Sequence, residues 1–423
     1  MASIGPMIGS LLRKIMLKKI LVKRLPKLWG QTLNKSDFEG NAYGLPGEWV
    51  YFATAKAPHQ GVLGFFNPFQ EQEVFGQLVG TGGEGPELVD LSSEANLKVD
   101  SEKFVLELLT KSLDLRLNVF SYLDNARIFY GHQDGLPGLI VDSYQNAVLI
   151  QINTAGVDRF RKTIKNFYQD KFGTQKQIIL LDAKKARSRE QLPAFEEDEK
   201  NDVPEFLIVN EGILQLKIHY KKLQKLGYYY DHRDNRVRLY RKLTELKLDM
   251  NLGLDLFCYH GAWGITLLKA GMDRVHFVDQ GSLGEAVYQN LILNNLPKKG
   301  DFFEQDAFKF LDQQIEQGTT YQVIVSDPPS FTKSAQKIQQ SLSGYRNLHF
   351  KVLSCASSRS LVAFCSCTSY VTMEQFEESI LWAAKQSKRS LRLVDVGLQA
   401  LDHPVRTLND KSNYLKYLAY IVE

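Results

Sequence analysis

The segment from Leu254 to Asp279 constrains the fold of this chain more than any other. It starts with an apolar strand that leads into a turn containing Gly261 and Gly264, and a helix is expected over residues 265–270. A second apolar strand follows and ends at Asp279. Glycines in such a turn let the backbone approach a ligand, and an acid after the second strand can accept both hydroxyls of a ribose. This order predicts an α/β unit that binds an adenosine-containing cofactor.

The same alternation continues through the C-terminal part of the chain. Apolar strands are expected at 252–256, 274–278, 321–326, 361–365, 391–396 and 417–422. Because helix-sized segments separate them, these strands predict a mostly parallel, doubly wound, Rossmann-like sheet. Ligands of such sheets bind at the carboxyl ends of the strands, so the functional residues are expected there.

Two regions of different character precede this part of the chain. Residues 18–90 contain short strands punctuated by glycine and proline, which predict a small β-barrel. Residues 98–225 mix helical and strand periodicity and predict a central α+β domain. The segment 80–86, near the end of the first region, has the composition of a linker. We therefore expect three domains, at 18–90, 98–225 and 226–423.

The composition favours a cytoplasmic protein without a membrane span. Four cysteines in 423 residues are too few for a disulfide framework and indicate reduced thiols. No apolar run is long enough to cross a membrane. Basic residues interrupt the apolar stretches up to Lys27, which excludes a signal peptide and leaves a mitochondrial transit peptide as the alternative to a basic first strand. The net charge of +4 is compatible with an RNA partner.

Acidic residues at three strand ends are candidates for the cofactor site. Asp255 precedes the turn, Asp279 is placed for the ribose, and Asp306 follows a third strand and could accept from an adenine amino group. Alternatively, Asp279 or Asp306 only caps the next helix. The turn lacks the G-x-G-x-x-G pattern of dinucleotide oxidoreductases, and the chain has no Walker A sequence, which argues against a nucleoside triphosphatase.

The segment Asp327-Pro328-Pro329-Ser330-Phe331 closes a further strand. Its prolines stiffen a short loop whose carboxylate and carbonyl groups can hold the polar edge of a planar base. The ring of Phe331 could stack on that base. The alternative is a plain strand-terminating turn. Together with the cofactor turn, this loop indicates a methyltransferase.

Cys367 follows the strand expected at 361–365. Methylation of carbon 5 of a pyrimidine requires that carbon to become nucleophilic, and addition of a thiolate to carbon 6 achieves this. Cys367 is nearer the ligand end than Cys365, although periodicity puts both on one face. The alternative is an inert buried thiol. Neither cysteine has a histidine or a second cysteine pair at metal-ligand spacing, so no metal site is predicted.

The stretch 228–236, Tyr-Tyr-Tyr-Asp-His-Arg-Asp-Asn-Arg, is rich in side chains that stack or bind anions. It could close over the cofactor and reach RNA phosphates through Arg233 or Arg236. The alternative is a buried aromatic strand that runs into a solvated helix.

These motifs together resemble the bacterial 23S ribosomal RNA cytosine-5 methyltransferases, which join a PUA domain to a class I, S-adenosylmethionine-dependent catalytic domain. The resemblance covers nearly the whole chain and is carried by segments 134–142, 227–233, 255–259, 327–331, 345–346, 366–367 and 402–405. The match of the N-terminal barrel is looser. The resemblance implies methylation of carbon 5 of a cytosine in 23S ribosomal RNA, after the target base has left its stack.

The resemblance also implies roles for individual residues. Cys367 is the implied nucleophile, and Asp327 binds the cytosine and assists its protonation. The implied cofactor-binding residues are Asp231, His232, Arg233, Asp255, Phe257, Tyr259, His260, Gly261, Gly264, Asp279, Asp306 and Asp327. Substrate contacts are expected from Pro328, Pro329, Phe331 and Arg236. The first two domains are expected to grip large-subunit ribosomal RNA by shape and backbone, and a homodimer is compatible with the sequence.

The chain departs from the family pattern at several positions. His232, His260 and His349 stand where Gln, Thr and Asn are usual, and the segment 357–360 replaces a glycine pair. Imidazoles still offer hydrogen bonds, but with a different pH dependence. Two rival functions stay open, the first because related enzymes share the Asp-Pro-Pro-x-Phe loop and the second because of these departures. One is a guanine-N7 methyltransferase of the same fold, which needs no cysteine, and the other is a non-catalytic RNA-binding or ribosome-assembly protein.

Overall fold

The computed structural model describes residues 15–27, 32–80, 86–120, 125–181, 184–193, 203–223, 227–332, 334–407 and 412–423. The start of the basic N-terminal segment and most of the predicted linker, residues 81–85, lie outside the described residues. Residue contacts divide the chain into two compact units. The first unit comprises residues 1–203 without 124–126 and 144–146, and the second comprises those two short segments and residues 204–423.

The first unit begins with a six-stranded sheet in the order β2-β4-β5-β6-β3, with β7 also paired to β5. These strands are β2 (Lys18–Val22), β3 (Thr32–Asn34), β4 (Glu48–Thr54), β5 (Ala57–Phe66), β6 (Val74–Leu78) and β7 (Val89–Asp90). Short elements complete this part: β1 (Ile15–Met16) paired with β8 (Lys98–Val99), η1 (Lys35–Asp37) and α1 (Glu94–Leu97). Buried side chains such as Val50, Phe52 and Phe66 form its core. The all-β character expected for 18–90 is therefore observed.

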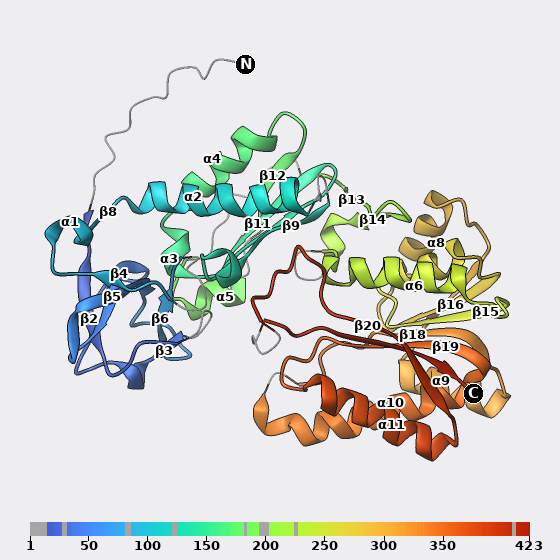
Figure 1. The fold of residues 1–423 in the computed structure, drawn as a ribbon. Coiled ribbons are helices and arrows are strands. Elements are labelled where there is room, and N and C mark those ends of the chain that lie inside the picture. Colours follow the sequence, from blue (N-terminus) through green and yellow to red (C-terminus); the bar gives the residue numbers. More distant parts are fainter. Residues whose placement is uncertain are drawn as a thin grey trace. The chain divides into compact units, whose positions relative to one another are not determined.

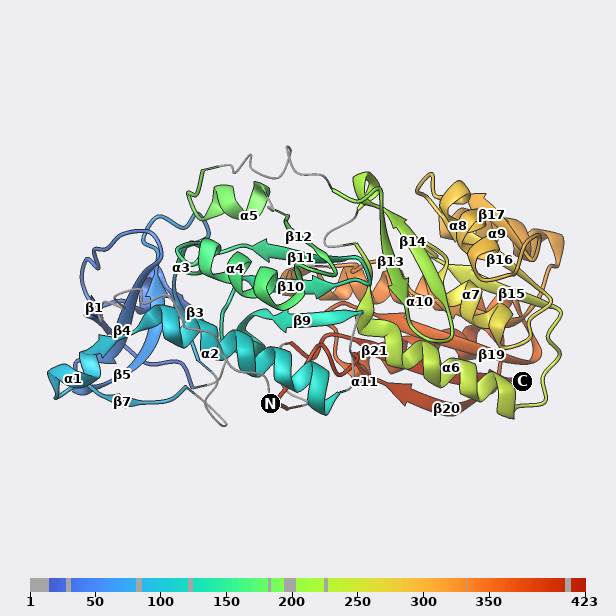
Figure 2. The ribbon, with the colours of Figure 1, turned by 90° about the horizontal axis from the view of Figure 1, so that it is seen from above.

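The remainder of the first unit is a four-stranded sheet with helices (Figure 2). The sheet has the order β12-β11-β10-β9. Its elements are α2 (Ser101–Asp114), the π-helical turn η2 (Leu115–Val119), β9 (Ala126–Tyr130), η3 (Gly131–Asp134), β10 (Leu139–Ser143), β11 (Ala147–Ile152), α3 (Ala155–Asp158), α4 (Arg161–Phe172), β12 (Gln177–Leu180) and α5 (Lys184–Arg189). Helical periodicity continues from residue 157 to 172, but the chain breaks between α3 and α4 and forms two helices there. Phe160 leaves the helical conformation at the break, and its ring packs edge-on against Trp49.

The second unit contains a seven-stranded sheet in the order β17-β16-β15-β18-β19-β21-β20. The strands are β15 (Leu252–Leu256), β16 (Arg274–Asp279), β17 (Gly300–Glu304), β18 (Tyr321–Ser326), β19 (Ala356–Ser366), β20 (Leu391–Gly397) and β21 (Lys416–Val422). The first five strands in this order run parallel, whereas β21 runs antiparallel to both β19 and β20. The predicted mostly parallel, doubly wound sheet is confirmed.

Helices cover both faces of this sheet (Figure 1). The helices α6 (Arg233–Glu245), α7 (Ala262–Lys269) and α8 (Gly284–Leu293) cover one face, and α9 (Ala307–Gln317), α10 (Ile338–Ser354) and α11 (Met373–Ser387) cover the other. The turns η5 (Tyr220–Lys222), η6 (Tyr230–His232) and η7 (Ala335–Lys337) complete the unit. No helix among the described residues has the length and apolar character needed to cross a membrane.

A hairpin made of β13 (Phe206–Asn210) and β14 (Gln215–His219) also belongs to the second unit. The side-chain oxygen of Asn294 accepts from Gln215 N at 2.9 Å, and that of Asn290 accepts from Lys217 N at 2.8 Å. These bonds attach β14 to α8. The second unit therefore begins before residue 226, where the sequence pattern placed the boundary, and the division into three domains stays a prediction.

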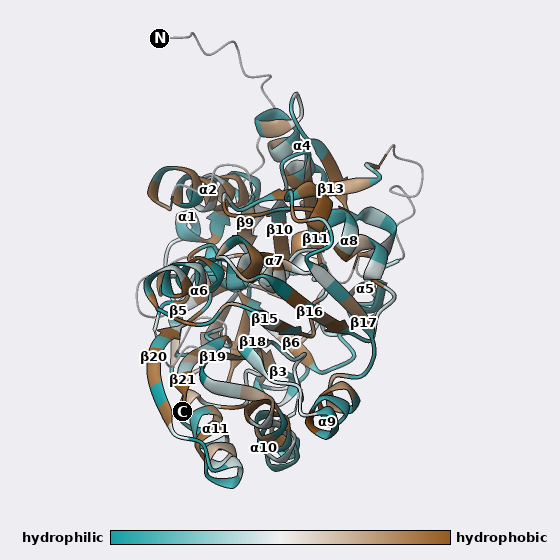
Figure 3. Cartoon of the chain, turned by 90° about the vertical axis from the view of Figure 1, so that its right-hand side faces the viewer, coloured by the Kyte–Doolittle hydropathy of each residue, from teal (hydrophilic) through white to brown (hydrophobic). Residues whose placement is uncertain are grey.

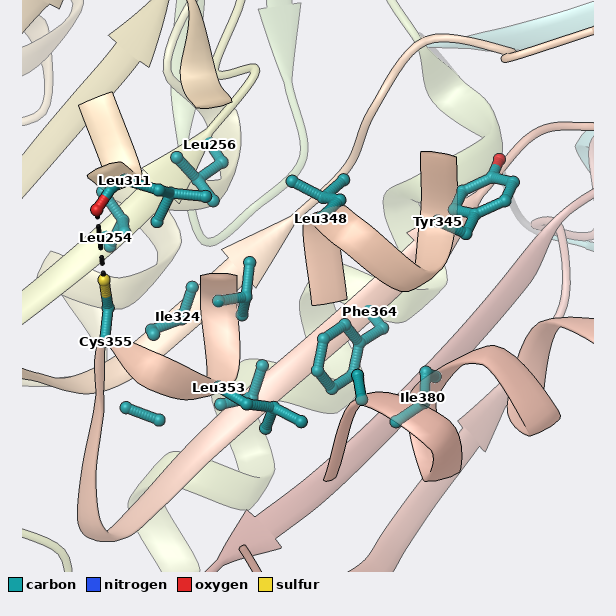
Figure 4. Packing of buried hydrophobic residues seen from close by; sticks show 14 of the residues in the cluster. Leu254, Leu256, Leu311, Ile324, Tyr345, Leu348, Leu353, Cys355, Phe364 and Ile380 are labelled. Atoms are coloured by element: carbon teal, nitrogen blue, oxygen red, sulfur yellow. Dashed lines mark hydrogen bonds between the residues drawn. The ribbon is translucent and has the colours of Figure 1, made fainter. Parts of the chain in front are cut away.

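Aliphatic and aromatic side chains between the sheet and helices α9, α10 and α11 form the main core (Figure 4). Leu256, Ile324 and Phe364 come from three neighbouring strands, and Leu348 and Leu353 come from α10. Figure 3 shows brown, hydrophobic residues along β15 and β16, while teal residues appear on the outer helices. Strands that are buried on both faces read as near-continuous apolar runs, which is why their positions could be predicted from sequence.

The strand β19 is irregular at one of the positions where the chain departs from the family pattern. Its register with β18 shifts between Tyr321 and Val323, and Arg359 in this stretch has φ of 59°. This left-handed conformation is costly for a residue with a Cβ atom and natural for glycine. The usual glycine pair at 357–360 is therefore replaced here at a position that still adopts a glycine-like backbone.

We expect Arg359→Gly to stabilise the protein by about 1 kcal/mol, because it removes the strain of the left-handed conformation at an exposed site. The free energy of unfolding would be measured by urea denaturation. Arg359→Ala is the matched control, since it removes the same side chain and keeps the Cβ atom. Equal stabilities of the two variants would contradict this explanation.

Candidate functional site

A pocket of about 810 Å³ opens at the carboxyl ends of the parallel strands of the second unit. It is lined by Tyr228, Tyr229, Asp231, His232, Arg236, Phe257, Cys258, Tyr259, His260, Ala262, Trp263, Asp279, Gln280, Asp327, Pro328, Pro329, Ser330, Thr332, Cys367, Ser369, Tyr370, Tyr414 and Leu415. Most of the residues predicted for the cofactor and the substrate are in this set. Asp255, Gly261, Gly264, Arg233, Asp306 and Phe331 are not.

The turn after β15 is tightly wound. Phe257, Tyr259 and Gly261 have φ of 62°, 48° and 83°, so three of five consecutive residues are left-handed. Non-glycine residues rarely adopt this conformation and do so mainly where a function requires it. Gly264 has a different reason for being glycine, because a Cβ atom there would lie 2.1 Å from the ring of Phe277. It packs α7 against β16 and does not line the pocket.

Asp255 supports this turn from below. Its side chain is fully buried, and Oδ2 accepts from Gly264 N at 2.7 Å. Burial raises the pKa of Asp255 well above its ordinary value, and the nearby carboxylates of Asp327 and Asp279 act in the same direction. Asp255 therefore fixes the turn and does not itself line the pocket.

Asp279 ends β16 and lines the pocket. Its Oδ2 accepts from Tyr259 N at 3.0 Å, and its Oδ1 accepts from Gly281 N at 2.8 Å. These bonds join the first turn to the second strand end. Each carboxylate oxygen has a further lone pair that can accept a hydrogen bond from a ribose hydroxyl.

Asp306 lies one strand further along. Its Oδ1 accepts from Lys309 N at 3.1 Å and caps α9, while its Oδ2 accepts from Gln280 Nε2 at 2.6 Å. The alternative stated for this residue, a helix cap, is what the structure contains. A contact with an adenine amino group stays a prediction.

Asp327 is held at the mouth of the pocket by two neighbours. Trp263 Nε1 donates to its Oδ2 at 3.0 Å, and His232 Nε2 lies 3.3 Å from its Oδ1. Trp263 lies between Gly261 and Gly264, so the turn after β15 and the loop after β18 are directly linked. The prolines that follow Asp327 also line the pocket, and Pro329 is exposed.

The two candidate cysteines differ in exposure. Cys367 is half-buried and lines the pocket, and its Sγ lies 3.9 Å from Pro328 O. Cys365 is fully buried in β19, and burial raises the pKa of its thiol well above the ordinary value. The periodicity that put both cysteines on one face ends with β19 at Ser366. The geometry therefore favours Cys367 as the reactive thiol.

Cys365 nevertheless lies close to two possible metal ligands. Ligand atoms of His232, Asp327 and Cys365 are all within 4.8 Å of one another, which the sequence spacing did not indicate. A thiol that burial keeps protonated is a poor metal ligand, and one oxygen of Asp327 already accepts from Trp263. We do not assign a metal site to this group, and the expected absence of a metal stays a prediction.

Tyr345 holds the turn that carries Cys367. Its hydroxyl lies 2.8 Å from both Ser366 Oγ and Thr368 Oγ1, the residues on either side of the cysteine. Thr368 Oγ1 also accepts from Phe331 N at 3.3 Å. The loop after β18, the turn that carries Cys367 and α10 are therefore joined by one group of buried hydroxyls.

Phe331 packs against a residue of α10. Its ring stacks on Tyr345 with 4.5 Å between the centroids, and it does not line the pocket. Tyr345 therefore covers one face of the Phe331 ring, and the stacking of Phe331 on a substrate base stays a prediction. Tyr370, which the sequence analysis overlooked, lines the pocket and is 46% exposed. Its position only three residues after Cys367 was the available signal.

The aromatic stretch before α6 forms the turn η6 and not a strand. Asp231 lines the pocket and its Oδ2 accepts from Tyr414 Oη at 2.6 Å, which attaches the stretch to the segment before β21. Arg236 is buried and donates to both carboxylate oxygens of Glu211 at 2.9 and 2.7 Å. Arg233 is also buried, and its guanidinium lies 3.5 Å from an oxygen of Asp402. Both guanidinium groups are paired with internal acids in this structure, and the contacts of Arg233 and Arg236 with RNA phosphates stay a prediction.

The three unusual histidines fall in two environments. His232 and His260 are buried side chains that line the pocket. His349 lies in α10, where burial lowers its pKa to about 3 and its Nδ1 lies 3.2 Å from Ser379 Oγ. His349 is therefore a neutral core residue, whereas the other two are placed to touch a ligand.

Comparison with known proteins finds relatives that are similar in sequence over most of this chain. No protein-family model matches the chain. The "Putative ribosomal RNA large subunit methyltransferase" of Methanocaldococcus jannaschii is 27% identical over 352 residues, which cover 82% of this chain and 87% of the relative. "Ribosomal RNA large subunit methyltransferase I" of Cronobacter sakazakii is 28% identical over 303 residues, which cover 70% of this chain and 74% of the relative.

Solved structures resemble the chain over almost its full length. The structure titled "A putative sam-dependent methyltransferase from Streptococcus mutans" has a TM-score of 0.73 at 18% identity and covers 96% of this chain and 100% of that chain. A second, a "putative methyltransferase complexed with SAH", has a TM-score of 0.72 at the same identity and with the same coverage of both chains. These neighbours establish the fold, and the relatives confirm the resemblance to ribosomal RNA methyltransferases. The predicted cofactor, S-adenosylmethionine, agrees with both comparisons.

We expect Asp255→Asn to become more stable relative to the natural protein as the pH rises from 5 to 8. The raised pKa means that the folded state binds a proton that the unfolded state has released, so the natural protein loses stability with rising pH. Asn cannot release a proton, so it abolishes this dependence on pH while still accepting from Gly264 N. Thermal melting of both proteins at several pH values measures the difference. Asp249→Asn, at an exposed site, is the control, and a pH-independent difference for Asp255→Asn would contradict the assignment.

Proposed function

We propose that this protein is an S-adenosylmethionine-dependent methyltransferase that forms 5-methylcytidine in large-subunit ribosomal RNA, with Cys367 as the nucleophile. The observation that carries this proposal is the position of Cys367. It is the one cysteine of the four that is not buried, and it lines the same pocket as Asp231, Asp279 and Asp327, three of the acids expected to bind the cofactor. The guanine-N7 alternative gives no role to a thiol at that place.

The residues of the pocket fit the proposed cofactor. Asp279 presents a carboxylate to the ribose hydroxyls, and the left-handed turn from Phe257 to Gly261 brings backbone groups close to the same place. The aromatic side chains of Tyr229, Tyr259 and Trp263 supply apolar surface for the remaining parts of the cofactor. S-adenosylmethionine supplies the methyl group of the reaction.

The chain's own residues then act on the base in a fixed order. The Cys367 thiolate adds to carbon 6 of the cytosine, which makes carbon 5 nucleophilic toward the methyl group. Asp327 and the carbonyl groups of its loop hold the polar edge of the ring and favour its protonation. A base removes the proton from carbon 5, and the thiolate leaves by β-elimination. This sequence regenerates the thiolate and the aromatic ring.

The target nucleotide must leave its stack to reach the pocket. We propose that Tyr370, exposed at the pocket, stacks on the extruded base or its neighbour. The first unit and its basic N-terminal strand would bind the RNA backbone by charge and shape. We retain as predictions a cytoplasmic location, the absence of a metal and the compatibility with a homodimer.

Replacing Cys367 by Ala should abolish methyl transfer and leave cofactor binding intact. The purified protein would be incubated with isotope-labelled S-adenosylmethionine and unmodified 23S ribosomal RNA, and the labelled nucleoside identified by mass spectrometry. We expect 5-methylcytidine from the natural protein. Cys365→Ala is the control. Because the Cys365 side chain is buried, this substitution should lower the stability of the protein more than its turnover.

Other products would each change the assignment. Label in 7-methylguanosine would make Cys367 a structural residue and establish the rival enzyme. If the protein binds the cofactor but transfers no methyl group to naked 23S ribosomal RNA or to partly assembled large subunits, a non-catalytic protein is favoured. Retained turnover in Cys367→Ala would remove the thiolate mechanism.

Replacing Tyr370 by Ala should raise KM for RNA roughly tenfold, because stacking of a base on an aromatic ring contributes about 1–3 kcal/mol. The same steady-state assay would measure it at fixed cofactor concentration. Tyr288→Ala is the matched control, since Tyr288 is 43% exposed on α8 and does not line the pocket. Equal KM values for the two variants would exclude Tyr370 from the RNA contact.

A further inference from the structure

Lys416, the first residue of β21, is a buried cation beside the proposed nucleophile. It pairs with Ser366 in the register of β19 and β21, and it is 4% exposed. Its Nζ donates to Thr368 O at 2.8 Å and to Tyr414 O at 2.9 Å. Both acceptors are neutral carbonyl groups, and no carboxylate of the described residues forms an ion pair with Lys416. Buried charges are normally paired, so this ammonium group calls for an anion nearby.

The thiol of Cys367 is the group placed to be that anion. Lys416 pairs with the residue before Cys367 and donates to the carbonyl group of the residue after it. The ammonium group is therefore fixed to the short turn that carries the sulfur. Burial lowers the pKa of Lys416 to about 8, and a negative charge on Cys367 acts in the opposite direction and raises it.

Several of the described groups around Cys367 supply no positive charge that would stabilise a thiolate there. They are Asp327 after β18, Tyr229 before η6, Tyr345 in α10 and Cys365 in β19. The Asp327 carboxylate opposes a second negative charge in the pocket, and the two tyrosines and Cys365 are neutral at ordinary pH because burial raises their pKa values. A thiolate at Cys367 therefore gains from a fixed positive charge that offsets Asp327.

We propose that Lys416 is the counter-ion of the Cys367 thiolate, held in place by the carbonyl groups of Thr368 and Tyr414. The thiol proton leaves to water, and the ammonium group keeps its own protons and stabilises the sulfur anion. Lys416 acts through Cys367, so it is a positioning residue. The proposal rests on the proposed role of Cys367 as the nucleophile, and it assigns a function to a residue that no sequence motif indicated.

The test is the pH dependence of Cys367 alkylation in the full-length protein without RNA. Iodoacetamide labelling of the peptide that contains Cys367 would be followed by mass spectrometry from pH 5 to 10. Lys416→Gln keeps hydrogen bonds to the two carbonyl groups and removes the charge, so the midpoint should rise by at least one pH unit, with at least a tenfold slower reaction at pH 7. Lys416→Arg keeps the charge and should leave the midpoint within a few tenths of a unit.

The controls separate charge from damage to the fold. Lys385→Gln, at an exposed position of α11, should leave the midpoint unchanged. Thermal melting and binding of S-adenosylhomocysteine would establish that each variant is folded. An unchanged midpoint in folded Lys416→Gln would overturn the proposal.

A reciprocal measurement covers the case in which Lys416→Gln does not fold. Acetic anhydride labelling of Lys416 would be compared in the natural protein and in Cys367→Ala between pH 7 and 10. Loss of the thiolate should lower the midpoint for Lys416, and identical profiles would overturn the proposal. Methyl transfer by Cys367→Ala is a separate readout. If transfer persists while the labelling midpoints shift, the ion pair stands and the nucleophilic role of Cys367 falls.

Discussion

The parallel pairing of β15 with β18 is the constraint on which the rest of the site depends. Leu256 pairs with Ser326, so the cofactor turn and the Asp327 loop leave the sheet at the same level. Trp263 from the first turn can then donate to Asp327 after the second strand. A slip of one residue in this register would exchange the two faces of β18 and turn Asp327 away from the pocket. The next pairing, of β18 with β19, brings the end of β19 and hence Cys367 to the same edge.

Buried hydroxyl groups make this arrangement specific. Tyr345 joins the residues on both sides of Cys367, and Thr368 passes the link to the loop after Asp327. Such a network is stable only when each member is satisfied, because an unpaired hydroxyl in the core is costly. The ring of Tyr345 also packs on Phe331 and faces the main core. The position of the thiol is thus determined by a helix on one face of the sheet as well as by its own strand.

The sequence allowed prediction of features that depend on neighbours along the chain. Apolar runs located the parallel strands, and the place of Cys367 after β19 separated it from Cys365. Long-range partners could not be predicted in this way. The burial of Arg236 could not be predicted, because its partner Glu211 lies in a separate hairpin. The stacking of Phe331 on Tyr345 could not be predicted, because Tyr345 lies in a later helix. The position of Lys416 could not be predicted either, because its partner Thr368 follows another strand. The break at Phe160 likewise depends on Trp49, more than 100 residues upstream.

The acidic lining of the pocket has a consequence for turnover. Asp231, Asp279 and Asp327 all contribute to its wall. With the proposed cofactor, the sulfur carries a positive charge before methyl transfer and none afterwards. A unit charge about 4 Å from a carboxylate is worth between about 1 and 4 kcal/mol as the surroundings change from water to a protein surface. We infer that this acidic pocket binds the charged donor more tightly than the neutral-sulfur product, so that the loss of charge during the reaction favours exchange of product for fresh donor.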